Sequence, residues 1–228
     1  MDSEQPQQKS TLDLDDPFGI GGLAGGFGEN WEVIFEQEDA TIKRKFNETN
    51  NVYRFYTKGI LKGVTAKSLY DLNIDTTYRK TWDANCAKLE VIEEAKQSGG
   101  FLLETLFWSV SYPFPFSNRE YVFQRKYKHD VENNFYAIDS KATENDKRPS
   151  KKASGVRVEV FESTLVVREL EGDPSSCEYI SLYMENPGGS IPMWLFNWAI
   201  SSAVPKGLDD LKRASTNYPA YLEKRKKK

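Results

Sequence analysis

Alternating hydrophobic and polar residues dominate the chain from Trp31 onward. The segments ATIKRKF (40–46) and NVYRFYTKGIL (51–61) alternate on either side of the turn signal NETNN, which predicts a β-hairpin. Six further strand-like segments follow, separated by polar or Gly/Pro turns: LEVIEEAK (89–96), FLLETLFWSVSY (101–112), REYVFQRKYK (119–128), NFYAIDSKAT (134–143), GVRVEVFESTLVVREL (155–170) and EYISLYMEN (178–186). Because no helical segment separates them, as parallel crossovers would require, we expect an antiparallel, strongly curved sheet.

Helical spacing of apolar residues occurs in two other places. TAKSLYDLNID (65–75) predicts a helix with Thr65 as its N-cap, and TYRKTWDANC (77–86) predicts a second, short one. After residue 186 the spacing predicts one long terminal helix, which Pro205 should kink because proline removes a backbone hydrogen bond. Its apolar stripe contains Leu195, Trp198, Ala199, Leu208, Leu211 and Ala214. A helix that follows an antiparallel sheet indicates the α+β class, with the sheet wrapped around the helix.

The chain divides into one domain and two tails. Its 228 residues suffice for one substantial core. Residues 1–28 are acidic and Gly-rich, which predicts a flexible leader, residues 29–222 form the domain, and residues 223–228 form a basic tail. The leader segment GIGGLAGG loosely matches a dinucleotide-binding loop, but it lacks the preceding strand and following helix that such a loop needs.

Composition and charge exclude several classes of protein. A net charge of −3 argues against a nucleic-acid-binding protein, which usually displays a basic face. The two cysteines form no CxxC pair, so neither a metal site nor a disulfide framework is expected, and no cofactor is indicated. We expect a cytoplasmic protein, peripheral to membranes, since no secretory signal or membrane-spanning apolar segment is found. The basic tail is either simply solvated, attracted to anionic lipid, or an import signal.

An enzyme is not expected. The chain contains no GxSxG nucleophile motif, which argues against a lipid or thioester hydrolase. His129 is the only histidine, and it lies in the polar segment YKHDVENN, as a surface residue would.

Arg79 and Asp83 stand four residues apart in the short second helix, with Tyr78 and Trp82 beside them. This spacing places both charges on one helix face. A surface ion pair of this kind contributes only about 0.3–0.5 kcal/mol. The residues by themselves leave open whether this pair lies on the surface or binds an anion.

Four longer motifs resemble one known family. YRKTWD (78–83), YPFPFSNREYV (112–122), SGVRVEVF (154–161) and NPGGSIPMWLFNWA (186–199) occur in the order and spacing of the START (StAR-related lipid transfer) domain family, most similarly in its phosphatidylcholine transfer branch. The resemblance covers about Trp31 to Tyr218. It implies a helix-grip fold, in which a nine-stranded antiparallel sheet and a long C-terminal helix enclose an internal lipid tunnel.

The resemblance also implies a headgroup site. Arg79 matches the phosphate-binding arginine and Asp83 its acidic neighbour, which suits a phosphate because guanidinium can donate two parallel hydrogen bonds. Trp108, Tyr121 and Phe161 match a cage for choline, with Phe161 where tyrosine is usual. Strict alternation along residues 156–161 would turn Phe161 outward unless a bulge intervenes. Ordinary core packing is the alternative for all three aromatic residues.

The resemblance assigns the tunnel and its lid as well. Its lid loop is PFPFSN (113–118), beside the terminal helix, where Phe114 and Phe116 can enter a tunnel mouth or a bilayer. A turn packed on its own domain is the alternative. The residues assigned to tunnel and lid are Val110, Phe114, Phe116, Trp194, Leu195 and Trp198.

The function that this resemblance implies is the carriage of one phospholipid between membranes by a monomer. Phosphatidylcholine is the expected ligand, with phosphatidylethanolamine as a second, and contact with the membrane surface is transient. A lipid-gated sensor or interaction module, which binds phospholipid without net transfer, is the alternative function. Sterol or ceramide cargo would leave Arg79 and the aromatic cage without a role.

Overall fold

The computed structural model describes residues 31–143, 155–188, 192, 194–195 and 199–227. These residues form ten strands and three α-helices, and a single π-helical turn precedes the last helix. The strands are β1 (Glu32–Gln37), β2 (Ala40–Asn47), β3 (Val52–Leu61), β4 (Cys86–Ser98), β5 (Phe101–Val110), β6 (Arg119–Asp130), β7 (Phe135–Ala142), β8 (Val156–Arg157), β9 (Phe161–Leu170) and β10 (Asp173–Glu185). The helical elements are α1 (Ala66–Ile74), α2 (Thr76–Trp82), η1 (Ala199–Ala203) and α4 (Val204–Lys226).

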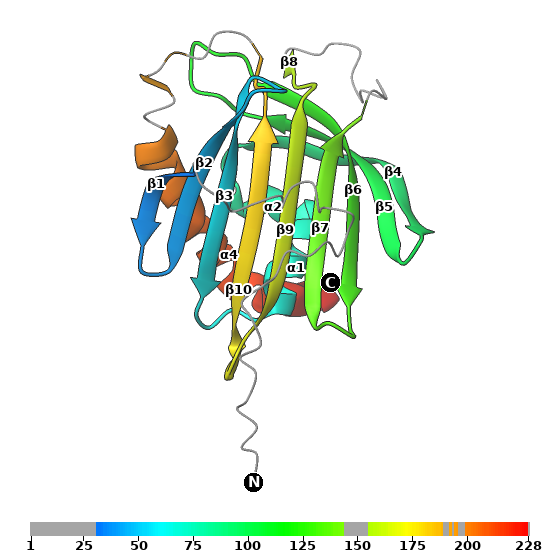
Figure 1. The fold of residues 1–228 in the computed structure, drawn as a ribbon. Helices are drawn as coiled ribbons and strands as arrows, with labels where there is room; N and C mark the ends of the chain where they lie inside the picture. Colours follow the sequence, from blue (N-terminus) through cyan, green and yellow to red (C-terminus); the bar gives the residue numbers. More distant parts are fainter. Residues whose placement is uncertain (1–30, 144–154, 189–191, 193, 196–198, 228) are drawn as a thin grey trace.

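All ten strands belong to one sheet, in the order β1-β2-β3-β10-β9-β7-β6-β5-β4, with β8 beside β6 (Figure 1). Neighbours on the main path pair antiparallel, whereas the two-residue β8 pairs parallel with β6. The expected α+β helix-grip fold with nine antiparallel strands is therefore confirmed, with β8 as a short addition.

The two short helices begin where the sequence places capping residues. Thr65 caps α1 by accepting a hydrogen bond from the backbone N–H of Ser68, as predicted. The Asp75 side chain caps α2 and accepts from the N–H groups of Thr77 and Tyr78. Both caps satisfy backbone donors that a helix start leaves without partners.

Helices α1, α2 and α4 lie on the same face of the curved sheet, behind it in the view of Figure 1. Tyr78 of α2 fixes α4 there: its hydroxyl donates to the backbone oxygen of Ala214 at 2.9 Å, and its ring lies 4.4 Å from that of Tyr221. Tyr218 adds a hydrogen bond of 3.2 Å to Asp75. These contacts hold the C-terminal half of α4 against the α1–α2 pair.

The terminal segment is irregular next to Pro205, where the sequence predicts an interruption. The π-helical turn η1 runs directly into α4, and its last residue, Ala203, has helical dihedral angles, so helical backbone continues up to Pro205. Pro219 lies inside α4, a position that the sequence analysis did not single out. The helix continues to Lys226, so most of the predicted basic tail is helical.

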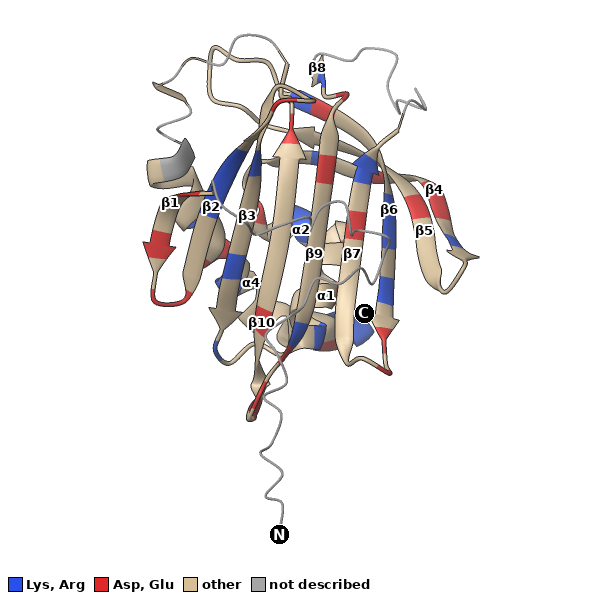
Figure 2. Ribbon diagram, in the orientation of Figure 1, with Lys and Arg blue, Asp and Glu red and all other residues tan. Residues whose placement is uncertain are grey.

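Charged residues of both signs are interspersed over the described strands that face the viewer in Figure 2. A protein that binds duplex nucleic acid would instead present a continuous basic face. Among the described residues, no helix has both the length and the apolar character needed to cross a bilayer.

Candidate headgroup site in the cavity between sheet and helices

The sheet and helices line a half-open cavity of about 140 Å³ on the helix-covered face of the sheet. Side chains of α1, α2 and five strands line it: Asn73, Arg79, Leu89, Trp108, Phe123, Arg125, Ile138, Ser140, Phe161, Ser163 and Leu165. Ligand pockets for drug-sized molecules usually measure ~300–1,000 Å³. The cavity is therefore large enough for part of a lipid, and a whole phospholipid would require its walls to move apart.

Arg79 reaches this cavity from α2, and Asp83 holds it there. The Nε atom donates a hydrogen bond of 2.7 Å to Oδ2 of Asp83, and both side chains are mostly buried. The guanidinium lies 4.7 Å from the ring of Trp82 and 5.4 Å from that of Trp108, within the range of cation–π attraction. Among the described residues, no hydrogen-bond partner is found for the two Nη groups of Arg79. The pair thus lies at a cavity wall and still has N–H donors to offer.

Arg125 is the second arginine in the cavity wall, and its hydrogen bonds are already made. Its Nε and Nη2 atoms donate to Oε1 of Glu104 at 2.8 and 2.5 Å. Its Nη1 and Nη2 atoms donate to the backbone oxygens of Asn73 and Ile74, both at 2.9 Å. Arg125 therefore ties strands β5 and β6 to the end of α1. The sequence analysis did not single out this buried pair, because charged residues in strands usually lie on the solvated face, although Glu104 and Arg125 are direct partners across the β5–β6 hairpin.

Trp108, Tyr121 and Phe161 form one aromatic group, named here the cage cluster. Trp108 and Tyr121 are direct partners across β5 and β6, with ring centroids 5.1 Å apart. The rings of Tyr121 and Phe161 lie 5.2 Å apart, edge to face. Trp108 and Phe161 line the cavity together with Arg79, whereas Tyr121 does not line it and packs against the two other rings.

The inward direction of Phe161 depends on a break in the predicted strand. Residues 158–160 belong to no strand, so residues 155–170 form β8 and β9 rather than one continuous strand. Val158 and Phe161 are consequently both buried in the same cluster, although strict alternation would place them on opposite faces. The structure thus shows the interruption that Phe161 needs to face the cavity side.

Glu185 lies behind the cage cluster, at the end of β10, as the direct cross-strand partner of Phe161. Its Oε2 atom accepts hydrogen bonds from the hydroxyls of Tyr121 at 2.6 Å and Tyr183 at 2.7 Å. Burial raises the pKa of both phenols above the ordinary value, and the nearby Glu185 carboxylate raises it further. The phenols therefore stay protonated as donors. The sequence analysis missed Glu185; its only signal was its place directly before the NPGG motif.

The predicted lid residues lie around the β5–β6 loop. Phe114 at its tip is 95% exposed, whereas the ring of Phe116 lies 5.9 Å from that of Trp194, which is 56% exposed. Leu195 is buried, and Val110 packs against the cluster that contains Phe161. The loop therefore contacts the segment before α4 through Phe116 and Trp194. Trp198 lies outside the described residues.

Arg119 connects the same loop to the start of the terminal segment. Its guanidinium donates to the backbone oxygens of Ser117 at 2.6 Å, Pro187 at 2.7 Å and Gly188 at 3.2 Å. It also lies 4.3 Å from the ring of Tyr112. This buried side chain therefore links the end of the β5–β6 loop to the residues that directly follow β10.

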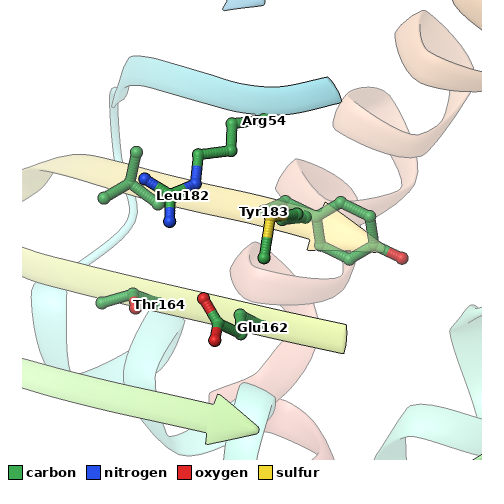
Figure 3. Close-up of a pocket in the computed structure, with 6 residues that line it drawn as sticks. Arg54, Glu162, Thr164, Leu182 and Tyr183 are labelled. Carbon is green, nitrogen blue, oxygen red and sulfur yellow. The ribbon is translucent and has the colours of Figure 1, made fainter. Parts of the chain in front are cut away.

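A second hollow lies on the opposite face of the sheet and measures only about 10 Å³ (Figure 3). Glu162 and Thr164 of β9 line it, whereas the alternate residues Phe161, Ser163 and Leu165 line the larger cavity. Figure 3 shows Leu182 of the neighbouring β10 beside them. The hollow has room for no more than a water-sized group, so it is not a lipid site.

No chemistry of metals or thiolates is indicated in the part of the chain that the structure describes. No group of three or more His, Cys, Asp or Glu side chains that could hold a metal ion is found among these residues. Both cysteines are free thiols, and burial raises the pKa of each, that of Cys177 to about 12. Such thiols stay protonated and unreactive at neutral pH. His129 is exposed and stacks on Tyr136, away from the cavity lining.

Known proteins share this fold and much of this sequence. The mouse (Mus musculus) phosphatidylcholine transfer protein is 34% identical over 194 residues, which are 84% of this chain and 86% of that protein. The human (Homo sapiens) StAR-related lipid transfer protein 7, mitochondrial, is 32% identical over 191 residues, or 83% of this chain. The chain spans about half the length of this second relative, 50%.

Solved structures agree with the fold. The crystal structure of human STARD10 aligns with a TM-score of 0.75 at 23% identity, covering 95% of this chain and 86% of that one. Human StAR-related lipid transfer protein 5 aligns with a TM-score of 0.70 at 16% identity, covering 83% and 88%. The START domain model matches residues 23–220. The chain therefore belongs to the START domain family.

Proposed function

We propose that this protein binds one phospholipid and transfers it between membranes, with phosphatidylcholine as its preferred cargo and phosphatidylethanolamine as a second. The observation that carries the proposal is the contrast between the two arginines of the cavity. The guanidinium of Arg125 donates hydrogen bonds to Glu104 and to backbone oxygens at the end of α1. The guanidinium of Arg79 donates only from Nε, to Asp83. Guanidinium N–H groups directed to a cavity are suited to phosphate oxygens.

The cage cluster is suited to the choline part of the headgroup. A trimethylammonium group has no N–H to donate, so it is held by the faces of aromatic rings, at about 0.5–2 kcal/mol per ring. Trp108 and Phe161 line the same cavity as Arg79. Phosphate and choline are joined by a two-carbon link, so a phosphocholine group requires a cation site and an aromatic site side by side. The relative named phosphatidylcholine transfer protein makes this the first cargo to test.

To load a phospholipid, the protein must contact the membrane surface and its cavity must widen. Exposed Phe114 and half-exposed Trp194 place large apolar side chains at one end of the molecule, where a bilayer interface would accept them. The Phe116–Trp194 contact is the closure that must open for the acyl chains to pass. In this role the protein acts as a monomeric carrier without enzymatic activity.

Transfer of labelled phosphatidylcholine between vesicles, with far less protein than lipid, tests the proposal. A carrier moves many lipids per protein molecule, and native mass spectrometry should find one phospholipid per chain. Arg79→Ala should abolish transfer because a charge-assisted hydrogen bond contributes about 1.5–3 kcal/mol. Lys80→Ala is the matched control, since Lys80 is the exposed neighbour on the same helix. Stoichiometric binding without turnover would identify a lipid-gated sensor instead, and sterol as the only cargo would refute the headgroup site.

A further inference from the structure

Glu185 places a negative charge directly behind the cage cluster. It is the cross-strand partner of Phe161, and directly opposed residues in an antiparallel pair have Cβ atoms about 4.5–5.5 Å apart. Both phenols that donate to it belong to the aromatic surroundings of Phe161, since the ring of Tyr183 also lies 5.9 Å from that ring. An ionised carboxylate can only accept hydrogen bonds, which agrees with two donors meeting at one oxygen.

No cation is paired with this carboxylate among the described residues. Arg119 hydrogen-bonds to residues that follow Glu185 in the chain, but it directs its N–H groups to the backbone oxygens of Ser117, Pro187 and Gly188. The two hydrogen-bonding phenols stay protonated, so they bring no charge of their own. A partly buried carboxylate without a counter-ion is costly unless a cation comes to it.

We propose that Glu185 is a specificity-determining residue, the counter-ion that makes the cage select phospholipids whose headgroup carries a positive nitrogen. This inference rests on the proposed function, which it deepens. Arg79 and Glu185 then supply a cation and an anion at opposite ends of one headgroup, in the order that a zwitterionic phosphocholine or phosphoethanolamine requires. Ring faces attract a cation and disfavour an anion only weakly, whereas a fixed negative charge nearby strengthens both effects.

The carboxylate of Glu185 also affects the two phenols that donate hydrogen bonds to it. A hydroxyl that donates to a carboxylate leaves its ring more electron-rich, which strengthens the attraction of the ring face for a cation. The same two bonds fix the orientation of the Tyr121 ring, which packs against both Trp108 and Phe161. Glu185 therefore acts on the headgroup by charge and through the ring that it positions.

The test is competitive loading from vesicles with equal phosphatidylcholine and phosphatidylglycerol, whose headgroup is not cationic. The ratio of the two lipids in the repurified protein is measured by mass spectrometry. Glu185→Gln keeps an oxygen that accepts from the tyrosines but removes the charge. We expect the phosphatidylcholine to phosphatidylglycerol ratio to fall at least about fivefold, the effect that Coulomb's law gives for unit charges about 4 Å apart in water, and further where burial lowers the dielectric constant.

Glu162→Gln is the matched control. Glu162 adjoins Phe161 in β9 but lines the hollow on the opposite face, so the same loss of charge should leave the ratio unchanged. Glu185→Asp keeps the charge and should keep most of the preference. A merely structural role would alter the melting temperature or the total lipid bound without altering the ratio.

The outcomes separate this inference from the proposed function. A wild-type protein that loads neither lipid refutes the proposed function. A wild-type protein that prefers phosphatidylcholine, with the same ratio in Glu185→Gln, refutes only the role of Glu185. Should Glu185→Gln fail to fold, the triple variant E185L/Y121F/Y183F removes the charge together with the two hydroxyls that donate to it, so that neither of these phenols is left without its partner. An unchanged ratio in that variant would equally overturn the inference.

Discussion

Asp83 binds Arg79 through one nitrogen only: its Oδ2 atom accepts from Nε at 2.7 Å, while its Oδ1 atom accepts from the backbone N–H of Asn85 at 3.0 Å. The carboxylate is thus fixed by the chain that follows α2, and it orients the guanidinium without consuming the Nη groups. Compensation of charge and readiness to bind an anion are therefore combined in a single pair.

Replacing Asp83 with Asn should destabilise the lipid-free protein more than the loaded one. Without the carboxylate, the charge of Arg79 is balanced only when a phosphate is present. The pair is partly exposed, so we expect a loss of about 1 kcal/mol in the lipid-free state. Melting temperatures of delipidated and loaded protein check this, with Lys80→Ala as control. Equal losses in both states would mean that Asp83 does not compensate for a bound anion.

The buried pair of Glu104 and Arg125 should behave differently. Both side chains are less than a tenth exposed, so Glu104→Ala leaves a buried guanidinium charge without its partner. We expect a loss of about 3–5 kcal/mol in the free energy of unfolding, measured by urea denaturation with and without lipid. The double variant E104L/R125M should recover much of this loss. A loss as small as that of Asp83→Asn would show that water reaches the pair.

Trp108→Ala should reduce the discrimination between choline and ethanolamine headgroups. Ethanolamine can donate hydrogen bonds elsewhere, whereas trimethylammonium depends on ring faces, each contributing about 0.5–2 kcal/mol. Trp108 also lies near Arg79, but a weakened phosphate contact affects both lipids alike and cancels in their ratio. Competitive loading measures the ratio. Trp31→Ala, which packs against Tyr56 on the other face of the sheet, is the control that should leave it unchanged.

Tethering the loop to the terminal segment should stop lipid exchange. Phe116→Cys and Trp194→Cys can be joined by a short reducible dithiol linker, since the two native rings lie 5.9 Å apart. We expect the linked protein to retain bound lipid and to exchange none, and reduction should restore transfer. The background carries Cys86→Ser and Cys177→Ser to prevent other links. If the linked protein exchanged lipid as fast as the same protein after reduction of the linker, cargo would have to enter elsewhere.

The basic end of α4 should matter for anionic membranes only. Arg225 lies 3.6 Å from Asp75, the N-cap of α2, so deleting the end would also disturb the helix that carries Arg79. The triple variant K224Q/K226Q/K227Q avoids this. Each lysine near an anionic surface contributes about 1 kcal/mol of attraction, so transfer from anionic vesicles should slow and should become less sensitive to salt. Transfer between neutral vesicles is the internal control; slowing there would indicate damage to the cavity.

The sequence pattern predicted the fold well because its signals are local. Alternation, the Thr65 cap and the turn residues identify nearly every strand and both short helices. Where the prediction failed, residues distant in sequence decide the outcome. Phe161 turns inward because the strand breaks between β8, which pairs with β6, and β9, which pairs with β7 and β10. Alternation within one segment contains no information about those partners.

The site residues also fall into two groups, those that local sequence patterns identified and those that they did not. Motifs within a few residues of one another identified Arg79 and Asp83, and the symmetric β5–β6 hairpin explains why Trp108 and Tyr121 meet. The same hairpin register places Glu104 opposite Arg125, whereas Tyr121 and Glu185 are brought together only by the packing of strands distant in sequence. Charged residues in strands usually lie on the solvated face, so periodicity gave no reason to expect either group inside.

The contacts that fasten α4 from Ala214 to its C-terminal end leave only the N-terminal half of the helix to move, with a hinge near Ala214. Val204 is ten residues from Ala214, or about 15 Å along the axis at the usual rise per residue. A tilt of about 20° around that hinge displaces the far end by about 5 Å, similar to the ~4.8 Å spacing between neighbouring strands. The Tyr78 and Tyr218 contacts can stay intact while the far end swings. The molecule can thus gain volume for a lipid by bending one helix near Ala214, with the sheet left as it is.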